Sequence, residues 1–344
     1  MQRTDVAIIG AGPIGIELAV RFKREGIDYV QFDAKQVGAT MQWWPQGTRW
    51  FSSNDRIAIA GVPLITPGQE KATREEYLAY LRQIVTQFDL DVRTYEPVTD
   101  IDREDGGFVV TTEPAAGTTQ TFAKRIVLAT GGTDRPRKLD IPGADLPQVL
   151  HYYDDPHTFF RRKVLILGGK NSAVETALRC HHVGAKVSLA HRQDALPESS
   201  IKYWLMPEMK GLLKRNTIEG YFNAEAVKIT PTHVTLKRTV AGSDETFDVE
   251  ADFVLAMIGY EQDNRLFRLA GIELTGDDQR PAFDEATMQT NIPGIYVAGT
   301  AMGGTQQKYR VFLENCHVHI DKITAALKGE TSDAEYVPTE IPES

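Results

Sequence analysis

A strand, a glycine-rich turn and a helix follow one another at the N-terminus, and this order constrains the fold more than any other feature of the chain. The apolar residues 6–9 predict a buried strand, and residues 16–24 predict the helix. Between them, Gly10 permits a tight turn, Gly12 lets a pyrophosphate approach the backbone, and Gly15 lets the helix pack close to the strand. Because free N–H groups at the start of such a helix attract phosphate, this unit is expected to bind a dinucleotide.

An acidic residue favours this interpretation over a simple turn between a strand and a helix. Residues 29–32 predict a second strand that ends in Asp33, close to the separation of about 20 residues at which an acid binds the ribose hydroxyls. We therefore expect an adenine dinucleotide here. Because FAD and NAD share this fingerprint, the N-terminal unit alone leaves the choice between them open.

Composition excludes several classes of function. The chain of 344 residues, 42% of them hydrophobic, is long enough for two domains of ordinary size. Its net charge of -9 argues against a nucleic-acid partner and against an anionic membrane surface.

No apolar run reaches the roughly 18 residues of a membrane span and no signal peptide is recognised, so a cytoplasmic protein is expected. Cys180 and Cys316 lie far apart in the sequence, which excludes a C-x-x-C dithiol, and no metal site is expected.

The segment after the first unit is rich in aromatic and polar residues. Residues 34–50 are expected to pack in the core or on a flat ligand ring, and residues 51–56 to hold a ribityl chain or to cap a helix. An amphipathic helix is predicted at 73–88, with Thr73 as its N-cap and Glu76 three residues later. This helix is expected to serve packing.

A hairpin and a closing strand complete the first half. The hairpin joins residues 108–112 to 119–122, and the strand at 125–129 ends in Thr130 and Gly131. Residues 133–147, which contain several prolines, are expected to connect the two halves.

The pattern then begins again at residue 163. A buried strand at 164–167, a glycine turn at 168–173 and a helix at 174–182 form a second dinucleotide unit. Its next strand, at 186–190, ends in His191 and Arg192 where the first unit has an acid. An arginine at this place favours a 2′-phosphate, which it can bind through two hydrogen bonds.

The second half repeats the first beyond its glycine turn. A meander of strands at 227–230, 233–237 and 245–250 leads into a closing strand at 253–259. One unit with an acid and one with an arginine imply FAD in the first and NADPH in the second. A protein that binds both is suited to passing a hydride between them.

We therefore predict an α/β fold of two Rossmann-like domains, with the NADPH domain inserted into the FAD domain and with β-meander crossovers. The FAD domain is expected at 1–135 and 262–330, the NADPH domain at 150–258, and a loosely attached tail at 331–344. Near the C-terminus the sequence also predicts a strand that runs into Gly299, at residues 291–300, followed by a helix from about residue 308 to residue 328.

Across nearly its whole length the chain resembles the two-dinucleotide flavoproteins that include low-molecular-weight thioredoxin reductases, and within them the bacillithiol disulfide reductases. The narrower resemblance is carried by residues 51–53, 168–173, 200–204, 256–260 and 312–315. It implies FAD-binding and NADPH-binding residues at matching positions. For FAD these are Gly10, Gly12, Pro13, Ile14, Gly15, Asp33, Ala34, Lys35, Phe51, Ser52, Thr130, Gly131, Gly299, Thr300, Arg310 and Val311. For NADPH they are Gly168, Gly169, Lys170, Asn171, Ser172, Ala173, His191, Arg192, Lys202, Ile258 and Gly259, with Arg192 and Lys202 at the 2′-phosphate.

Two positions depart from these families. The bacillithiol reductases carry a cysteine in the first glycine turn, where this chain has Ile14, and thioredoxin reductases have an aspartate where this chain has Thr300. Cys316 is the remaining candidate for a redox role, and Cys180 is expected to be a small buried hydrophobe. His317 and His319 are expected to be surface or packing residues rather than acid catalysts.

The leading hypothesis is an NADPH-dependent FAD reductase whose acceptor is a small disulfide, such as bacillithiol disulfide, a protein such as ferredoxin or flavodoxin, or a quinone. The alternatives are an NADPH-dependent flavin monooxygenase and a redox sensor that merely holds FAD. A homodimer is expected from the resemblance.

Overall fold

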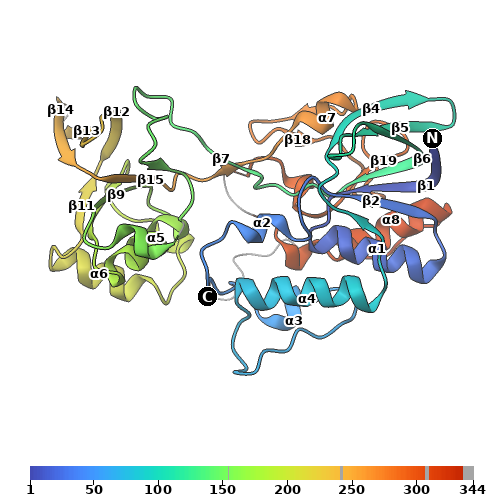
Figure 1. Ribbon diagram of the computed structural model, residues 1–344, viewed down its shortest axis with the longest axis horizontal. Helices are drawn as coiled ribbons and strands as arrows, with labels where there is room; N and C mark the ends of the chain where they lie inside the picture. Colours follow the sequence, from blue (N-terminus) through green and yellow to red (C-terminus); the bar gives the residue numbers. More distant parts are fainter. Residues whose placement is uncertain (154, 241–242, 307–309, 336–344) are drawn as a thin grey trace. The chain divides into compact units, whose positions relative to one another are not determined.

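The computed structural model describes residues 1–344 except 154, 241–242, 307–309 and 336–344. The chain divides into two compact units (Figure 1). The first unit comprises Met1–Gln42, Gly47–Arg135 and the described residues from Glu261 onward, and the second comprises Trp43–Gln46 and Pro136–Tyr260. Two short strands, β7 (Arg135–Pro136) and β16 (Tyr260–Glu261), lie where the chain passes between the units.

A seven-stranded sheet forms the centre of the first unit. Its strand order is β3-β2-β1-β6-β5-β4, and β19 also pairs with β6. Strands β1, β2, β3, β6 and β19 run parallel, whereas β4, β5 and β6 form an antiparallel meander. The bounds are β1 Gln2–Ile9, β2 Tyr29–Phe32, β3 Val92–Arg93, β4 Val98–Glu104, β5 Gly107–Thr112, β6 Thr119–Leu128 and β19 Ile295–Val297.

Strand β6 differs from the sequence prediction. Residues 119–122 and 125–129 were expected to be separate strands, but β6 is continuous from Thr119 to Leu128. Its first half pairs with β5 and its second half with β19, while β1 pairs along nearly all of its other edge. Strand β4 was not predicted, because the charged residues at its end mask the alternating pattern.

Helices α1 (Pro13–Glu25), α4 (Arg74–Gln87) and α8 (Val318–Lys328) contribute their apolar faces to the first unit. The predicted start of α4 is confirmed, because the Thr73 hydroxyl accepts from the Glu76 N–H and the Glu76 carboxylate accepts from the Thr73 N–H. Its aromatic residues Tyr77 and Tyr80 are buried, as expected for a packing helix. The shorter elements are α2 Ala39–Gln42, α3 Asn54–Ile57, α7 Arg265–Leu269, β17 Leu274–Thr275, β18 Arg280–Pro281 and two 3-10 turns, η3 Gly299–Gly303 and η4 Leu313–Asn315.

The predicted C-terminal helix begins later than the sequence suggests. Residues 308 and 309 of the expected span lie outside the described part, and α8 begins only at Val318. The Asn315 side chain explains the difference, because its oxygen accepts from the Phe312 N–H and its amide donates to the Arg310 carbonyl. These bonds satisfy backbone groups that a helix would pair internally. Most of the predicted tail, residues 336–344, also lies outside the described part.

The second unit is built on a parallel five-stranded sheet of order β11-β10-β9-β15-β8, with a three-stranded antiparallel meander, β12-β13-β14, packed beside it. Alternate residues of β9 face two apolar clusters. Val164 and Ile166 pack with Val174 of α5, while Leu165 and Leu167 pack with the meander. The bounds are β8 Val149–Leu150, β9 Lys163–Leu167, β10 Lys186–His191, β11 Glu219–Phe222, β12 Ala224–Ile229, β13 His233–Val240, β14 Ser243–Glu250, β15 Phe253–Ala256, α5 Asn171–His182, α6 Met206–Lys214, η1 Pro156–Phe159 and η2 Glu198–Ser200.

Candidate cofactor sites

The glycines of the first turn have the geometry that a dinucleotide site needs. Gly10 has a φ of +116°, and a Cβ atom there would lie 2.3 Å from the Ala129 carbonyl oxygen. A Cβ atom at Gly15 would lie 2.1 Å from the Gly10 carbonyl oxygen, so only glycine lets α1 approach the strand this closely. Gly12 differs, because a Cβ atom there would meet no described atom within 4 Å. Open space therefore lies in front of Gly12, where a pyrophosphate is expected.

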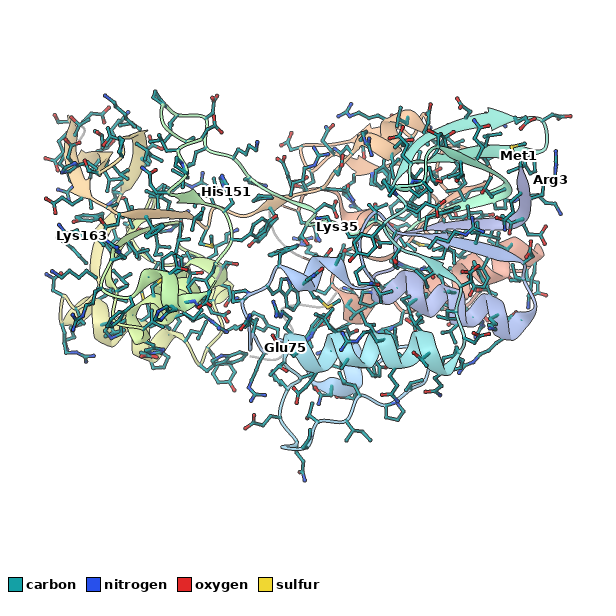
Figure 2. The ribbon with its side chains drawn as sticks, viewed as in Figure 1. Met1, Arg3, Lys35, Glu75, His151 and Lys163 are labelled. Carbon is teal, nitrogen blue, oxygen red and sulfur yellow. The ribbon has the colours of Figure 1, made fainter. Side chains whose placement is uncertain are left out.

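The Asp33 carboxylate is fixed by the backbone of the same unit. The Ala11 N–H donates to Oδ2 over 2.7 Å, and the Lys35 N–H donates to Oδ1 over 2.7 Å. Burial raises the pKa of the Asp33 carboxyl, and the two backbone hydrogen bonds oppose this shift. Ala34 and Lys35 follow β2 and are exposed. Lys35 is labelled in Figure 2. The carboxylate keeps lone pairs for a further donor such as a ribose hydroxyl.

The N-termini of α1 and α5 are open to an anion. Among the described residues, neither helix has a side-chain cap and neither has an acid in its first turn. Helix α4 provides the contrast, since Thr73 and Glu76 cap it and Glu75 adds a further negative charge. The first N–H groups of α1 and α5 are therefore available to phosphate, as the glycine turns predict.

A buried hydroxyl group lies just past the end of β6. The Thr130 hydroxyl oxygen is shielded from solvent and has no hydrogen-bond partner among the described residues. Gly131 follows with a φ of +85°. The Gln262 side chain donates to the carbonyls of Gly131 and Ala301, so it links this segment to the turn after β19. Buried hydroxyls normally have a partner, and a bound cofactor would supply one here.

Three segments meet beside the first glycine turn. Gly299 has a φ of +68°, and a Cβ atom there would lie 3.3 Å from Cβ of Ile14. A Cβ atom at Gly132 would lie 2.9 Å from the Thr300 carbonyl oxygen. The structure thus brings together Ile14, Thr300 and the glycines that follow β6, although they are far apart in sequence.

The other predicted FAD residues are engaged in different ways. Ser52 is buried, and its hydroxyl donates to the Glu314 carboxylate. The N–H groups of Arg310 and Val311 both donate to the Gln306 side-chain oxygen, over 2.9 Å in each case. Sequence analysis missed Gln306, because a lone glutamine near a glycine-rich turn carries no pattern.

The second glycine turn repeats the geometry of the first. Gly168 has a φ of +135°, and a Cβ atom there would lie 2.3 Å from the Met257 carbonyl oxygen. A Cβ atom at Gly169 would lie 2.3 Å from Nδ1 of His191, so the imidazole ring packs on the turn. Burial lowers the pKa of His191. The exposed Lys170, the half-buried Ser172 and the buried Ala173 complete this turn.

The two predicted phosphate ligands are in different settings. Arg192 is exposed just past the end of β10. Lys202 is only 5% exposed, and its ammonium group donates to the Glu175 carboxylate over 3.2 Å. Its backbone N–H also donates to the side-chain oxygen of Asn171, over 3.2 Å. Lys202 is therefore attached to the first turns of α5, whereas Arg192 faces solvent. After β15, the Gly259 carbonyl accepts from the Arg137 N–H, and Ile258 is half-buried.

Both cysteine thiols are buried and protonated at neutral pH. Burial raises the pKa of Cys180 to about 12. Burial also raises the pKa of Cys316 well above its usual value, and the negative charges of Glu314 and Glu17 add to this effect. Because the thiolate is the reactive form, neither side chain has the exposed, electropositive setting of a redox cysteine.

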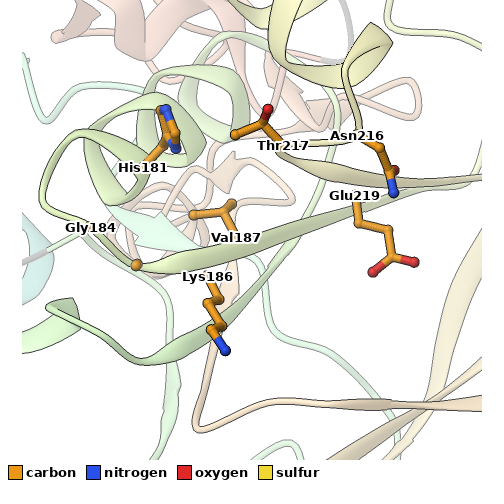
Figure 3. Close-up of a pocket in the computed structure, with 8 residues that line it drawn as sticks. His181, Gly184, Lys186, Val187, Asn216, Thr217 and Glu219 are labelled. Carbon is orange, nitrogen blue, oxygen red and sulfur yellow. The ribbon is translucent and has the colours of Figure 1, made fainter.

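One pocket of the second unit lies away from the predicted cofactor site. It has a volume of about 360 Å³ and is lined at the start of β10 and β11 by Lys186, Val187, Thr217 and Glu219 (Figure 3). The glycine turn instead follows the carboxyl end of β9, which runs parallel to β10.

The described part of the chain has no cluster of His, Cys, Asp and Glu suited to a metal ion. Among those same residues, no helix is both long enough and apolar enough to cross a membrane.

The chain belongs to the pyridine nucleotide-disulphide oxidoreductase family, whose model matches residues 7–299. It is 33% identical to bacilliredoxin reductase Bdr of Bacillus subtilis (strain 168). The aligned region is 328 residues long and covers 95% of this chain and 98% of the relative. The solved structure of bacillithiol disulfide reductase Bdr from Bacillus cereus matches with a TM-score of 0.89 and 32% identity, covering 95% of this chain and 99% of that chain. A ferredoxin–NADP reductase of Limosilactobacillus fermentum (strain NBRC 3956 / LMG 18251) is 30% identical over 305 residues, covering 87% of this chain and 86% of the relative.

The predicted class of protein is confirmed. The chain has the α/β fold of the two-dinucleotide flavoproteins, and it is an NADPH-dependent FAD oxidoreductase. When bound, FAD takes a hydride from NADPH and passes the electrons on to an acceptor.

Proposed function

We propose that this chain reduces a low-molecular-weight disulfide, of which bacillithiol disulfide is the first candidate, with electrons from NADPH. The relatives named for bacilliredoxin and bacillithiol disulfide support this choice of acceptor, since the likeness extends over 95% of the chain. In the overall reaction, NADPH, one proton and one disulfide give NADP⁺ and two thiols. Two electrons and two hydrogens reach the sulfur atoms, so the reaction balances.

The proposal assigns the cofactors to the two halves of the chain. FAD is held by the domain formed from 1–135 and 262–330, with Asp33 at the adenosine ribose and the start of α1 at the pyrophosphate. NADPH is held by 150–258, with the start of α5 at its pyrophosphate and Arg192 at its 2′-phosphate. Two observations on the described residues support the first assignment: the open space at Gly12, and the Thr130 hydroxyl, which has no hydrogen-bond partner among them.

The single observation that carries the thiol part of the proposal is the burial of both cysteines. A relay through the protein needs a thiolate that attacks the substrate and is then regenerated. The raised pKa values of Cys180 and Cys316 oppose that role. The first glycine turn offers Ile14, which is 6% exposed, and no thiol. The electrons are therefore proposed to leave from the cofactor itself.

A ferredoxin-type protein is the second candidate acceptor. The 30% identity to a ferredoxin–NADP reductase over 87% of the chain favours it. The absence of a thiol relay also suits it, because an electron-carrier protein needs no covalent intermediate with the reductase.

Anaerobic reduction by NADPH, followed by a panel of acceptors, tests the proposal. The panel contains bacillithiol disulfide, oxidised ferredoxin and flavodoxin, each added to the reduced protein. Rapid reoxidation by bacillithiol disulfide with release of two thiols supports the first candidate. Reoxidation by ferredoxin but not by bacillithiol disulfide would show that the acceptor is a ferredoxin-type protein. If no acceptor of the panel works without oxygen, but in air NADPH is consumed and an organic substrate gains one oxygen atom, the activity is that of a flavin monooxygenase.

A further inference from the structure

A buried histidine holds the turn that follows β19. The Gly299 N–H donates to Nδ1 of His319 over 3.0 Å, and His319 is 1% exposed. His319 is the second residue of α8, and Gly299 is the first residue of η3. The bond therefore connects two segments twenty residues apart in sequence.

The direction of this bond fixes the protonation of the imidazole ring. Because the backbone N–H donates, Nδ1 must carry a lone pair, and the proton of the neutral ring lies on Nε2. Burial, together with the positive charges of Lys322 and His317, lowers the pKa of His319 to about 3. The lowered pKa favours the neutral ring, which is the form that accepts from the Gly299 N–H.

The position of Gly299 gives this bond its importance. The preceding residue, Ala298, still donates to the Leu128 carbonyl of β6, so Gly299 is where the chain leaves the sheet. Its φ of +68° turns the backbone toward Ile14 of the first glycine turn. Among the described residues, η3 has no side-chain cap of its own. His319 therefore supplies the partner that the Gly299 N–H requires.

We infer that His319 is a positioning residue for the flavin: by accepting from Gly299 it fixes the turn of residues 299–303 beside Ile14, where the cofactor binds. This inference rests on the proposed placement of FAD at Gly299 and Thr300. His319 does not touch the cofactor in this account, and it acts only through the backbone of Gly299.

Two substitutions separate positioning from packing. His319→Asn keeps an acceptor at the place of Nδ1, whereas His319→Leu fills the space without one. Affinity is measured by titrating FAD into the flavin-free protein, and the absorption spectrum of the bound flavin is recorded. The Leu variant is expected to bind FAD about tenfold more weakly, because a buried N–H is left without a partner. The Asn variant is expected to remain within about threefold of wild type and to retain the wild-type spectrum.

A matched control comes from the same helix. The Thr324 hydroxyl is buried and donates to the Ile320 carbonyl of α8 itself. Thr324→Val removes one buried hydrogen bond from α8 without touching Gly299, so it is expected to lower the melting temperature and leave FAD affinity unchanged. If His319→Leu does not fold, His319→Gln replaces it, since its acceptor lies at the place of Nε2 and cannot restore the bond.

Gly12→Asp tests the placement of FAD independently of His319, because a side chain there meets no described atom within 4 Å and its carboxylate would repel the pyrophosphate. If Gly12→Asp loses FAD while His319→Leu binds it like wild type, His319 has no positioning role and the placement of FAD in the first unit is retained. If Gly12→Asp also binds FAD normally, the placement itself is wrong. Equal weakening by the Asn and Leu variants, or by Thr324→Val, would reduce His319 to a packing residue.

Discussion

The Ala11 N–H lies 2.7 Å from Oδ2 of Asp33, so the acid at the end of β2 is tied to the glycine turn that follows β1. This hydrogen bond fixes the turn after β1 to the end of β2, the strand that pairs with β1 in the parallel sheet. It also explains how one carboxylate can serve the turn and still present lone pairs to a ribose. The cofactor assignment of the first unit depends on this arrangement.

Asp33→Ala is predicted to weaken FAD binding about 10- to 150-fold, the range for loss of a hydrogen bond to a charged group. The measurement is a titration of the flavin-free protein with FAD. Asp105→Ala is the control, because Asp105 is an exposed acid in the turn between β4 and β5. Unchanged affinity in the Asp33 variant would contradict the ribose assignment.

The Asp134 carboxyl is predicted to make stability depend on pH. Burial raises its pKa from 3.8 to about 6, although it accepts from the Asp263 N–H. Because the folded state then holds a proton that the unfolded state releases, the free energy of unfolding falls as pH rises from about 4 to about 6, by up to about 3 kcal/mol. Asp134→Asn keeps an acceptor but removes the titration. Denaturant unfolding at pH 4.5 and 7.5 gives the free energy of unfolding of both proteins. The variant is expected to be more stable relative to wild type at pH 7.5 than at pH 4.5. An equal difference at the two pH values would refute the burial effect.

Arg192→Ala is predicted to weaken NADPH binding about 10- to 150-fold and to leave NADH nearly unaffected, because only NADPH carries the 2′-phosphate. Stopped-flow reduction with each nucleotide gives both affinities. Arg162→Ala is the control, since this exposed arginine precedes β9, at the other end of the strands. Equal losses for the two nucleotides would show that Arg192 does not bind the phosphate.

Local patterns predicted most of the fold. The strand, glycine turn and helix of each unit were predicted because glycine positions and apolar runs carry that information within a few residues. The capping box of Thr73 and Glu76 is local in the same way. The late start of α8 could not be predicted, because it depends on how the Asn315 side chain bonds the backbone of neighbouring residues.

The parts of the candidate sites that were missed depend on tertiary contacts. The bond between His319 and Gly299 joins segments whose closeness no local pattern indicates. The ion pair of Lys202 with Glu175 is a second example, since sequence alone suggested a lysine free to reach a phosphate. A side chain's partner is decided by packing, which single-sequence patterns do not contain.

Disulfide reduction by the double variant Cys180→Ser, Cys316→Ser, measured anaerobically with NADPH and bacillithiol disulfide, tests most directly whether electrons leave without a protein thiol. Turnover within about threefold of wild type is expected if they do, whereas loss of a covalent nucleophile costs orders of magnitude. Controls establish that the variant is folded, holds FAD and is reduced by NADPH at the normal rate. If such a variant no longer reduces a disulfide that wild type accepts, the thiol-free account is wrong, and Cys316 is the first residue to test alone.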